Sequence, residues 1–527
     1  MTALLTDNLS LLAGAPNGIK KLRELILELA VRGKLVPQDP SDEPASELLN
    51  LLITEARDTT GRGKAKRQAL PEVCESEQPY ILPNGWAWGR LGDVTAILDS
   101  LRRPVTKQDR KPGPYPYYGA SGVVDYVSAY IFDEPLVLVG EDGAKWGVGE
   151  RTAFSITGKT WVNNHAHVLR PKRDAVCDDY LVISLTAQDL SQFITGMTVP
   201  KLNQARLTSI GIPLPPLAEQ HRIVAKVDEL MALCDRLEAQ QADAESAHAL
   251  LVQALLHSLT QVADAEDFAA SWQRLAEHFH TLFTTESSID ALKQTLLQLA
   301  VMGKLVPQDP NDEPASELLQ RIAVERLDRE GSRRSKSQVE LREIDGSEKK
   351  FELPAGWEWV RLQQIVSVSS GDGLVSAKMN TEGSVPVYGG NGVTGHHDRQ
   401  NVEKETLVIG RVGYYCGSIH LTPASAWVTD NALIVRFSER NIDKSFLFWL
   451  LKGTNLKEQE NATAQPVISG RKIYPIVLAI PPLAEQRRIV AKLNQLMVLC
   501  DQLKTRLTQA RRLNEQLATA LVEQAVA

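Results

Sequence analysis

The chain has 527 residues, of which 43% are hydrophobic and 23% are charged, and its formal net charge is −7. This length exceeds what a single hydrophobic core supports, so we expect several domains. No apolar run approaches the roughly 18 residues of a membrane span, and the first residues lack the basic start of a secretory signal. The five cysteines are scattered and form no CxxC pair. These features argue against a membrane or secreted protein and favour the reducing cytoplasm.

The negative charge is concentrated in one part of the chain. Between Pro215 and Asp290 there are thirteen Asp and Glu residues against four Lys and Arg residues, so the remainder carries about +2. The acidic total therefore does not exclude DNA as a partner of the other regions.

The first half of the chain begins with an amphipathic helix and a distinctive segment. Apolar residues recur at helical spacing in "IKKLRELILELAVRG" from Ile19, and "GKLVPQDPSDEPASELL" follows from Gly33 to Leu49. Gly33 is placed where a helix ends in the left-handed conformation, and the prolines beyond it prevent continuation. A polar linker and a globular domain opening with "LPNGWAWGRL" at Leu82 come next.

The second half repeats this plan. "GKLVPQDPNDEPASELL" runs from Gly303 to Leu319, 270 positions downstream, and differs from the first copy at a single position. "LPAGWEWVRL" at Leu353 answers "LPNGWAWGRL", and "PPLAEQRRIVAKLNQLMVLCDQL" at Pro481 nearly repeats "PPLAEQHRIVAKVDELMALCDRL" at Pro215. The chain is thus a tandem duplication with pseudo-two-fold character. In each half, a nearly identical frame, made of the helix and segment before the domain and the proline-led helix after it, holds a divergent domain.

These repeats predict an α+β protein: two pseudo-two-fold-related globular domains separated by long antiparallel coiled-coil helices. The predicted boundaries are an N-terminal helix and repeat (1–50), a linker (51–81), the first globular domain (82–214), central helices, repeat and linker (215–352), the second globular domain (353–480) and a C-terminal helix (481–527).

Each long helix carries a heptad pattern that alternates steps of four and three residues. The series runs from Ile223 to Leu255 in the first helix and from Ile489 to Leu521 in the second. Eight positions are predicted to form the coiled-coil spacer: Val227, Leu230, Cys234, Leu237, Leu493, Leu496, Cys500 and Leu503. The alternative is that each helix lies on its own domain.

The globular domains contain loops in which cations alternate with aromatic and amide side chains, a composition that suits DNA recognition. In the first domain the candidate DNA contacts are Arg102, Arg103, Lys107, Arg110, Lys111, Tyr118, Ser121, Lys145, Lys201, Asn203 and Gln204. In the second domain they are Lys378, Asn391, Arg411, Tyr414, Ser469, Arg471 and Lys472. For any one of these residues, an ordinary solvated loop is the alternative.

Motifs for catalysis are weak. "AFSITGKT" at Ala153 resembles a phosphate-binding loop, but Ala153 stands where the pattern needs glycine and a strand-like stretch follows. His165 and His167 have no third ligand at metal spacing, so packed or hydrogen-bonded histidines are favoured over a metal site. We predict no catalytic residue and no bound metal.

The motifs "IPLPPLAEQHRIVAKVDEL" and "LAIPPLAEQRRIVAKLNQL", supported by "YYGASG" and "NGWAWGRLGDV", resemble the specificity subunit of type I restriction-modification systems. The resemblance covers nearly the whole chain. It implies two target-recognition domains that each read half of an interrupted DNA site. It also implies helices that dock two modification subunits, which methylate adenine with S-adenosylmethionine, and restriction subunits that use ATP and Mg²⁺.

The sequence therefore predicts a non-catalytic DNA-specificity subunit that itself binds no cofactor and acts in bacterial phage defence. The alternatives are a coiled-coil scaffold that binds DNA or protein only, and an enzyme, either a phosphate-loop NTPase or a methyltransferase with built-in recognition.

Overall fold

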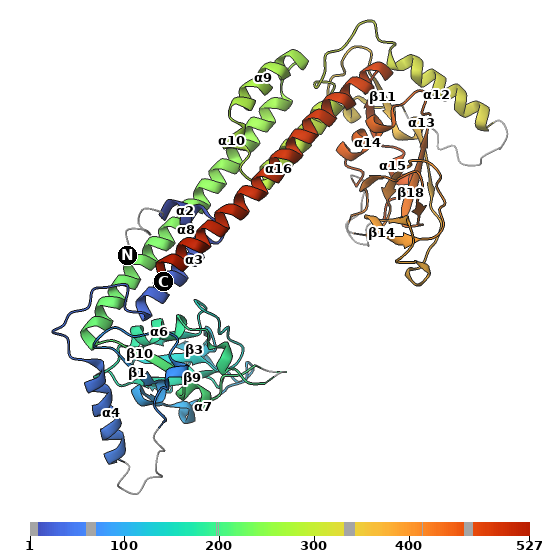
Figure 1. The fold of residues 1–527 in the computed structure, drawn as a ribbon. Helices are drawn as coiled ribbons and strands as arrows, with labels where there is room; N and C mark the ends of the chain where they lie inside the picture. The colour runs from blue at the N-terminus through green and yellow to red at the C-terminus, as the bar shows by residue number, and fades with distance from the viewer. Residues whose placement is uncertain are drawn as a thin grey trace. The chain divides into compact units, whose positions relative to one another are not determined.

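A computed structural model describes residues 9–59, 70–196, 198, 200–330, 343–413, 415–457 and 467–526. The chain divides into two compact units, which are Met1–Ala244 with Ala510–Ala527 (unit 1) and Glu245–Gln509 (unit 2). Figure 1 shows that each unit combines strands with helices. No helix in the described ranges is both long enough and apolar enough to cross a membrane.

Unit 1 contains a domain of strands and short helices that follows α2 to α4 in the sequence and precedes α8. Its helices are α2 (Leu9–Gly14), α3 (Gly18–Val31), α4 (Ala45–Thr59), α5 (Leu91–Val94), α6 (Asp178–Thr186), α7 (Gln204–Thr208) and the first part of α8 (Leu217–Thr260). Its strands are β1 (Ala87–Arg90), β2 (Thr95–Ile97), β3 (Pro112–Gly119), β4 (Gly122–Val127), β5 (Phe132–Asp133), β6 (Leu136–Gly140), β7 (Ala153–Ile156), β8 (Lys159–Val162), β9 (Ala166–Pro171) and β10 (Gly211–Leu214).

These strands form two four-stranded sheets, β2-β9-β6-β7 and β4-β3-β8-β5, and the pair β1-β10. The pair joins the start of the domain to its end, because Ala87 lies opposite Leu214 immediately before α8. Strand β6 is buried throughout, and it pairs antiparallel with β9 so that Gly140 lies opposite Ala166. The end of β6 and the start of β9 therefore lie side by side and position the loops described below.

Unit 2 has the same plan with one additional helix before α11. Its helices are the last part of α8, α9 (Ala265–Glu277), α10 (Phe279–Leu282), α11 (Glu286–Val301), α12 (Ala315–Glu330), α13 (Leu362–Ile365), α14 (Lys444–Gly453), α15 (Gly470–Ile473) and the first part of α16 (Leu483–Val526). Its strands are β11 (Glu358–Arg361), β12 (Val366–Ser370), β13 (Val385–Gly389), β14 (Gly392–His397), β15 (Leu407–Gly410), β16 (Ile419–Leu421), β17 (Trp427–Val428), β18 (Ala432–Phe437) and β19 (Val477–Ile480).

The sheets of unit 2 repeat those of unit 1. Their strand orders are β12-β18-β15-β16, β14-β13-β17 and β11-β19. Gly410 lies opposite Ala432, as Gly140 lies opposite Ala166 in unit 1. The α+β fold with two repeated domains and two long helices is therefore confirmed.

The long helices α8 and α16 are divided between the units in opposite order. Unit 1 contains the start of α8 and the end of α16, and unit 2 contains the start of α16 and the end of α8. The two helices therefore run antiparallel, as predicted. In unit 1, α3 contacts both of them, because Arg23 Nη2 lies 2.7 Å from Asp235 Oδ1 and Lys21 Nζ lies 2.7 Å from Thr519 Oγ1.

The eight predicted spacer positions lie on the buried side of their helices. Six have at most 4% of their surface exposed, and Leu237 and Leu503 are partly buried against the same clusters: Val227, Leu230, Cys234, Leu493, Leu496 and Cys500. The neighbours of the α8 positions within unit 1 include α3 and the domain itself. The alternative in which each helix lies on its own domain thus holds for the start of α8.

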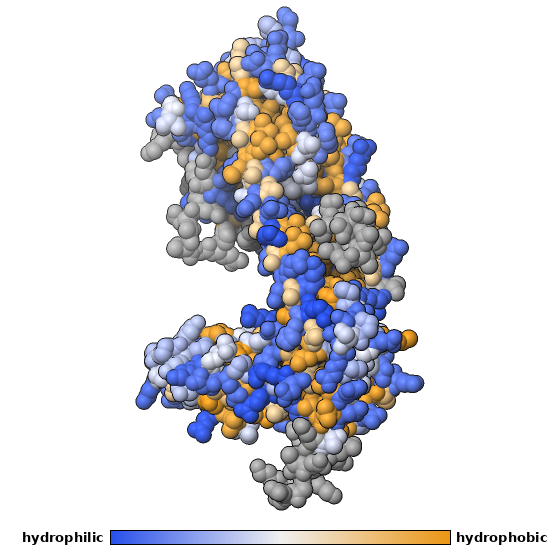
Figure 2. Space-filling view, turned by 90° about the vertical axis from the view of Figure 1, so that its left-hand side faces the viewer, coloured by the Kyte–Doolittle hydropathy of each residue, from blue (hydrophilic) through white to orange (hydrophobic). Residues whose placement is uncertain are grey.

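The heptad prediction is wrong at two leucines farther along the helices, whereas Leu255, Leu507 and Leu521 of the same series are partly buried. Leu251 and Leu517 were predicted to lie in the seam, yet both are 51% exposed. The buried residues are instead Val252 and Ala518, each 18 residues after Cys234 or Cys500. Cys234 and Val252 belong to different hydrophobic clusters, and so do Cys500 and Ala518, so the neighbours that bury each helix change along its length. On the face drawn in Figure 2, hydrophobic residues are exposed between hydrophilic ones.

The duplicated segment joins a short helix, the domain and a long helix. In unit 1 the amide Nε2 of Gln38 donates to the Gly33 carbonyl at 2.6 Å and to Glu219 Oε1 at 3.2 Å. The indole Nε1 of Trp86 donates to Glu219 Oε2 at 3.1 Å, and Arg222 lies 2.6 Å from Asp42. Gly33 has a φ of 67°, which confirms the predicted left-handed helix end.

Unit 2 repeats these contacts. Gln308 donates to the Gly303 carbonyl at 2.6 Å and to Glu485 at 3.1 Å, and Trp357 donates to Glu485 at 3.1 Å. Gly303 also has a positive φ, of 71°. Much of the identity between the two copies is therefore explained by internal contacts that fix the start of each long helix.

Candidate nucleic-acid interface

The basic loop of unit 1 precedes the hairpin formed by β3 and β4. Arg103, Lys107 and Lys111 have exposed side chains for which the described part of the chain provides no hydrogen-bond or ion-pair partner. Their charges are therefore available to phosphate oxygens. The loop is anchored to β3, because the Val105 amide donates to the hydroxyl of Tyr117 at 3.0 Å and Tyr117 is 1% exposed.

Arg110 has a different environment. Its guanidinium lies 3.0 Å from Asp125 Oδ2, donates to the Val105 carbonyl at 3.1 Å and stacks 4.4 Å from the ring centre of Tyr117. The Arg110 contact lowers the pKa of the Asp125 carboxyl. A hollow of about 140 Å³ lies beside it, lined in part by Lys111, Ser128 and Trp161. These contacts indicate that Arg110 orders the loop.

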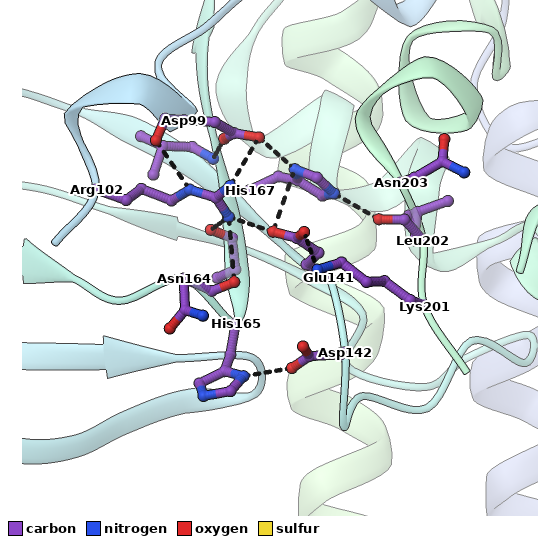
Figure 3. Close-up of polar contacts among 12 residues, drawn as sticks. Asp99, Arg102, Glu141, Asp142, Asn164, His165, His167, Lys201, Leu202 and Asn203 are labelled. Atoms are coloured by element: carbon purple, nitrogen blue, oxygen red, sulfur yellow. Dashed lines mark hydrogen bonds and ion pairs between the residues drawn. The ribbon is translucent and has the colours of Figure 1, made fainter. Parts of the chain in front are cut away.

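Arg102 belongs to a network of charged side chains, drawn in Figure 3, that joins the loop to β6 and β9. Its guanidinium pairs with Glu141, lies 3.3 Å from Asp99 and donates to the Ala166 carbonyl at 2.8 Å. Lys201 Nζ lies 2.7 Å from Glu141 Oε1. Because these cations have acidic partners within the chain, we assign Arg102 and Lys201 to this network, and their contact with DNA stays a prediction.

His167 is buried at the centre of this network. Its Nδ1 lies 2.5 Å from Asp99 Oδ2 and its Nε2 donates to the Leu202 carbonyl at 2.7 Å. Ligand atoms of Asp99, Glu141 and His167 lie within 4.8 Å of one another. Since Arg102 and Lys201 already supply positive charge there, the geometry favours an ion-pair network over a cation site, in agreement with the hydrogen-bonded role that the sequence predicts.

The other predicted residues of unit 1 lie in several environments. Ser121 is exposed in the β3–β4 turn, and Lys145 has 80% of its side chain exposed. Tyr118 packs on Phe154 with ring centres 5.9 Å apart, and burial raises its pKa. Asn203 caps α7, because its Oδ1 accepts from the Arg206 amide at 2.9 Å, and the exposed Gln204 begins that helix.

The predicted residues of unit 2 that the structure describes lie in turns and short helices outside the strands. Lys378, Asn391 and Arg471 are exposed, and Ser469 precedes α15. Lys472 donates to the Val467 carbonyl at 2.7 Å. Tyr414 lies outside the described residues. Arg411 is partly exposed, and its Nη1 makes two long contacts, 3.4 Å to Ser370 Oγ and 3.3 Å to the Asp430 carbonyl.

Sequence reasoning missed two features of these domains. The hairpin strand β4 exposes large apolar side chains, with Val124 at 56% and Tyr126 at 57%. It also missed the acidic members of the ion-pair network, Asp99 and Glu141. Neither residue has a distinctive sequence neighbour, and only the strand register brings them together.

The "AFSITGKT" stretch forms strand β7, a turn at Gly158 and strand β8. A phosphate-binding loop needs a helix that begins directly after the turn. The observed strand–turn–strand geometry does not provide one.

Two repeated mixed domains joined to long antiparallel helices, each with a basic edge, define a class of protein with paired recognition domains. Residues 83–245 and 354–510 match the family described as the type I restriction modification DNA specificity domain. The chain belongs to this family and is a specificity subunit of a type I restriction-modification system.

Two relatives agree with this assignment, and a solved structure shares the fold. The chain is 34% identical to the EcoAI and EcoEI type I restriction enzyme specificity subunits of Escherichia coli, over 97% of this chain and 94% of each relative. It also resembles a structure described as the basis of complex assembly and conformational transition of the type I R-M system. That likeness has a TM-score of 0.50 and 19% identity, covers 85% of this chain and 99% of the other, and shows the fold alone.

Proposed function

We propose that each globular domain contacts one half of a bipartite, interrupted DNA site, and that α8 and α16 set the gap between the half-sites. The single observation that carries this proposal is the contrast within the repeat. The frames share the same internal contacts, from Gln38 and Trp86 to Glu219 and from Gln308 and Trp357 to Glu485, whereas the basic loops differ. One frame with two different loops suits two recognition surfaces.

The duplicated segments are the proposed docking surfaces for two modification subunits. Pro37 and Pro40 are exposed in the first copy, and Pro307 and Pro310 are exposed in the second. Internal contacts do not account for the identity of these exposed residues. Two similar surfaces would let two copies of one partner bind an asymmetric target, with restriction subunits joining through them.

We further propose that this chain contributes no catalytic group. S-adenosylmethionine would then be bound by the modification subunits, and ATP with Mg²⁺ by the restriction subunits. The absence of a helix after the Gly158 turn supports this for nucleotides.

Adenine-methylation mapping by long-read sequencing, with the gene intact and deleted, tests the guiding role. Loss of one bipartite motif on deletion is expected. An unchanged methylome, with the partner methyltransferase shown to be expressed, would contradict the proposal and favour a scaffold.

The exposed cations of the unit 1 loop provide a second test. Replacing Arg103, Lys107 and Lys111 together with alanine should weaken DNA binding by the assembled complex without changing the motif. Three phosphate contacts contribute a slope of about 3 to the dependence of log K on log salt, so that slope should fall by about this amount. Arg236→Ala with Arg274→Ala, which removes exposed cations from α8 and α9, is the control. An unchanged slope in the triple variant would remove this loop from the DNA surface.

A further inference from the structure

Arg411 of unit 2 occupies the place that Glu141 occupies in unit 1. The Glu141 amide donates to the His165 carbonyl at 2.8 Å, and the Arg411 amide donates to the Asn431 carbonyl at 2.8 Å. The next contact also matches, because the amides of Leu202 and Ile468 donate at 2.8 Å to the carbonyls of Glu141 and Arg411. The backbones are thus equivalent at a position where the side-chain charge is reversed.

The charged neighbours of Glu141 are replaced by neutral residues in unit 2. Strand register places Ser370 where unit 1 has Asp99, since Val368 lies opposite Val435 as Ile97 lies opposite Leu169. By the same register, Leu433 follows Ala432 where His167 follows Ala166. Val467 takes the place of Lys201, because Val412 bridges to Val467 as Asp142 bridges to Lys201. An ion-pair network in unit 1 therefore becomes a lone arginine in unit 2.

The guanidinium of Arg411 has unused hydrogen-bonding capacity. Within the described residues no carboxylate lies within ion-pair distance, and its Nε is buried without a partner. Its two contacts, both from Nη1, are long at 3.3 and 3.4 Å. A guanidinium has five N–H donors, and leaving them unpaired costs free energy. Among the described residues these donors have no short contact, so they can bind an acceptor on DNA.

We infer that Arg411 reads a base with two adjacent acceptors, a guanine presenting O6 and N7, in the half-site contacted by unit 2. This inference rests on the proposed function. The planar fork of arginine matches this acceptor pair. Backbone hydrogen bonds to Asn431 and Ile468 hold the Arg411 backbone on both sides, which gives the side chain the fixed base that reading a DNA base requires.

The test compares Arg411→Lys, Arg411→Ala and wild type in the assembled complex, measuring methylation of a DNA library randomised in both half-sites. Arg411→Lys retains the charge but loses the bidentate fork, so discrimination at one guanine position should fall about 10- to 100-fold. The other half-site should be read unchanged. Arg440→Ala, an exposed arginine of the same unit, is the control and should leave every preference intact.

Three results would overturn the inference. A uniform loss across all sequences, with a smaller salt slope, would assign Arg411 to a phosphate. Unchanged preference in both variants, with folding verified by circular dichroism, would assign it to the fold alone. If the wild-type complex yields no bipartite motif, the proposed function fails together with the inference, which distinguishes that failure from one confined to Arg411.

Discussion

Insertion of seven residues into the exposed middle of each long helix, within 239–247 of α8 and 508–514 of α16, is expected to lengthen the gap of the recognised site by about three base pairs. Seven helical residues add about 10.5 Å, and B-DNA rises about 3.4 Å per base pair. Both stretches are exposed in the structure, so the insertions disturb no buried side chain. Seven residues also preserve the direction of each helix face to within about 20°.

Methylome sequencing of cells that carry the altered gene measures the new gap directly. Both half-sites should keep their sequences, and methylation at the original spacing should be lost. Replacing the same stretches with different helical sequences of equal length is the control, and it should leave the gap unchanged. An altered half-site, or the original gap retained after insertion, would show that the helices do not set the spacing.

Repetition made the architecture predictable from the sequence. The two copies of the segment after Gly33 and Gly303, together with the two proline-led helices, fixed the order of elements before any contact was known. The left-handed glycines followed from the same pattern, since only a residue without a side chain fits beside Trp86 or Trp357 at a positive φ.

The later heptad positions could not be predicted as well. A series with steps of three and four residues fits periods of 3.5 and 3.6 almost equally over a few turns. The structure buries Cys234 and Cys500 and exposes Leu251 and Leu517, whereas Leu255 and Leu521 are again partly buried. The series alone does not show which neighbour covers each turn of the helix.

The sequence predicts which basic residues gather in the loops of the candidate site, but not which acidic residues they pair with. Both Arg102 and Arg103 were chosen as cations of one loop, yet only strand register shows that Arg102 pairs with Glu141, 39 residues away. The reversed charge at Arg411 can be read from the sequence, because GEDG at 140–143 matches GRVG at 410–413, but only strand register and backbone contacts show that its neighbours also differ.

The contacts of Gln38 and Trp86 with Glu219 are repeated by Gln308 and Trp357 with Glu485, and these two sets, called corners below, support a matched pair of predictions. Replacing Glu219 with alanine would leave the Nε1 donor of the buried Trp86 and the Nε2 donor of Gln38 without this acceptor. The buried Trp86 donor costs about 1–3 kcal/mol, whereas Gln38 is exposed and keeps its bond to the Gly33 carbonyl. Burial raises the pKa of the Glu219 carboxyl, so relief from burying its charge offsets part of that loss. We therefore expect local stability to fall by about 1–2 kcal/mol, or roughly 5- to 30-fold in hydrogen exchange.

Hydrogen–deuterium exchange resolved by peptide separates the two corners. Glu219→Ala should accelerate exchange in the segment from Gly33 to Ala45 and leave Gly303 to Ala315 unchanged, and Glu485→Ala should do the reverse. Glu229→Ala, whose side chain is 65% exposed on the same helix as Glu219, should change neither segment. Equal acceleration in both segments from one substitution would mean that the corners are coupled. No acceleration in either would mean that the repeated Trp, Gln and Glu do not hold the helix, and the identity of the two copies would then point to the docked partner alone.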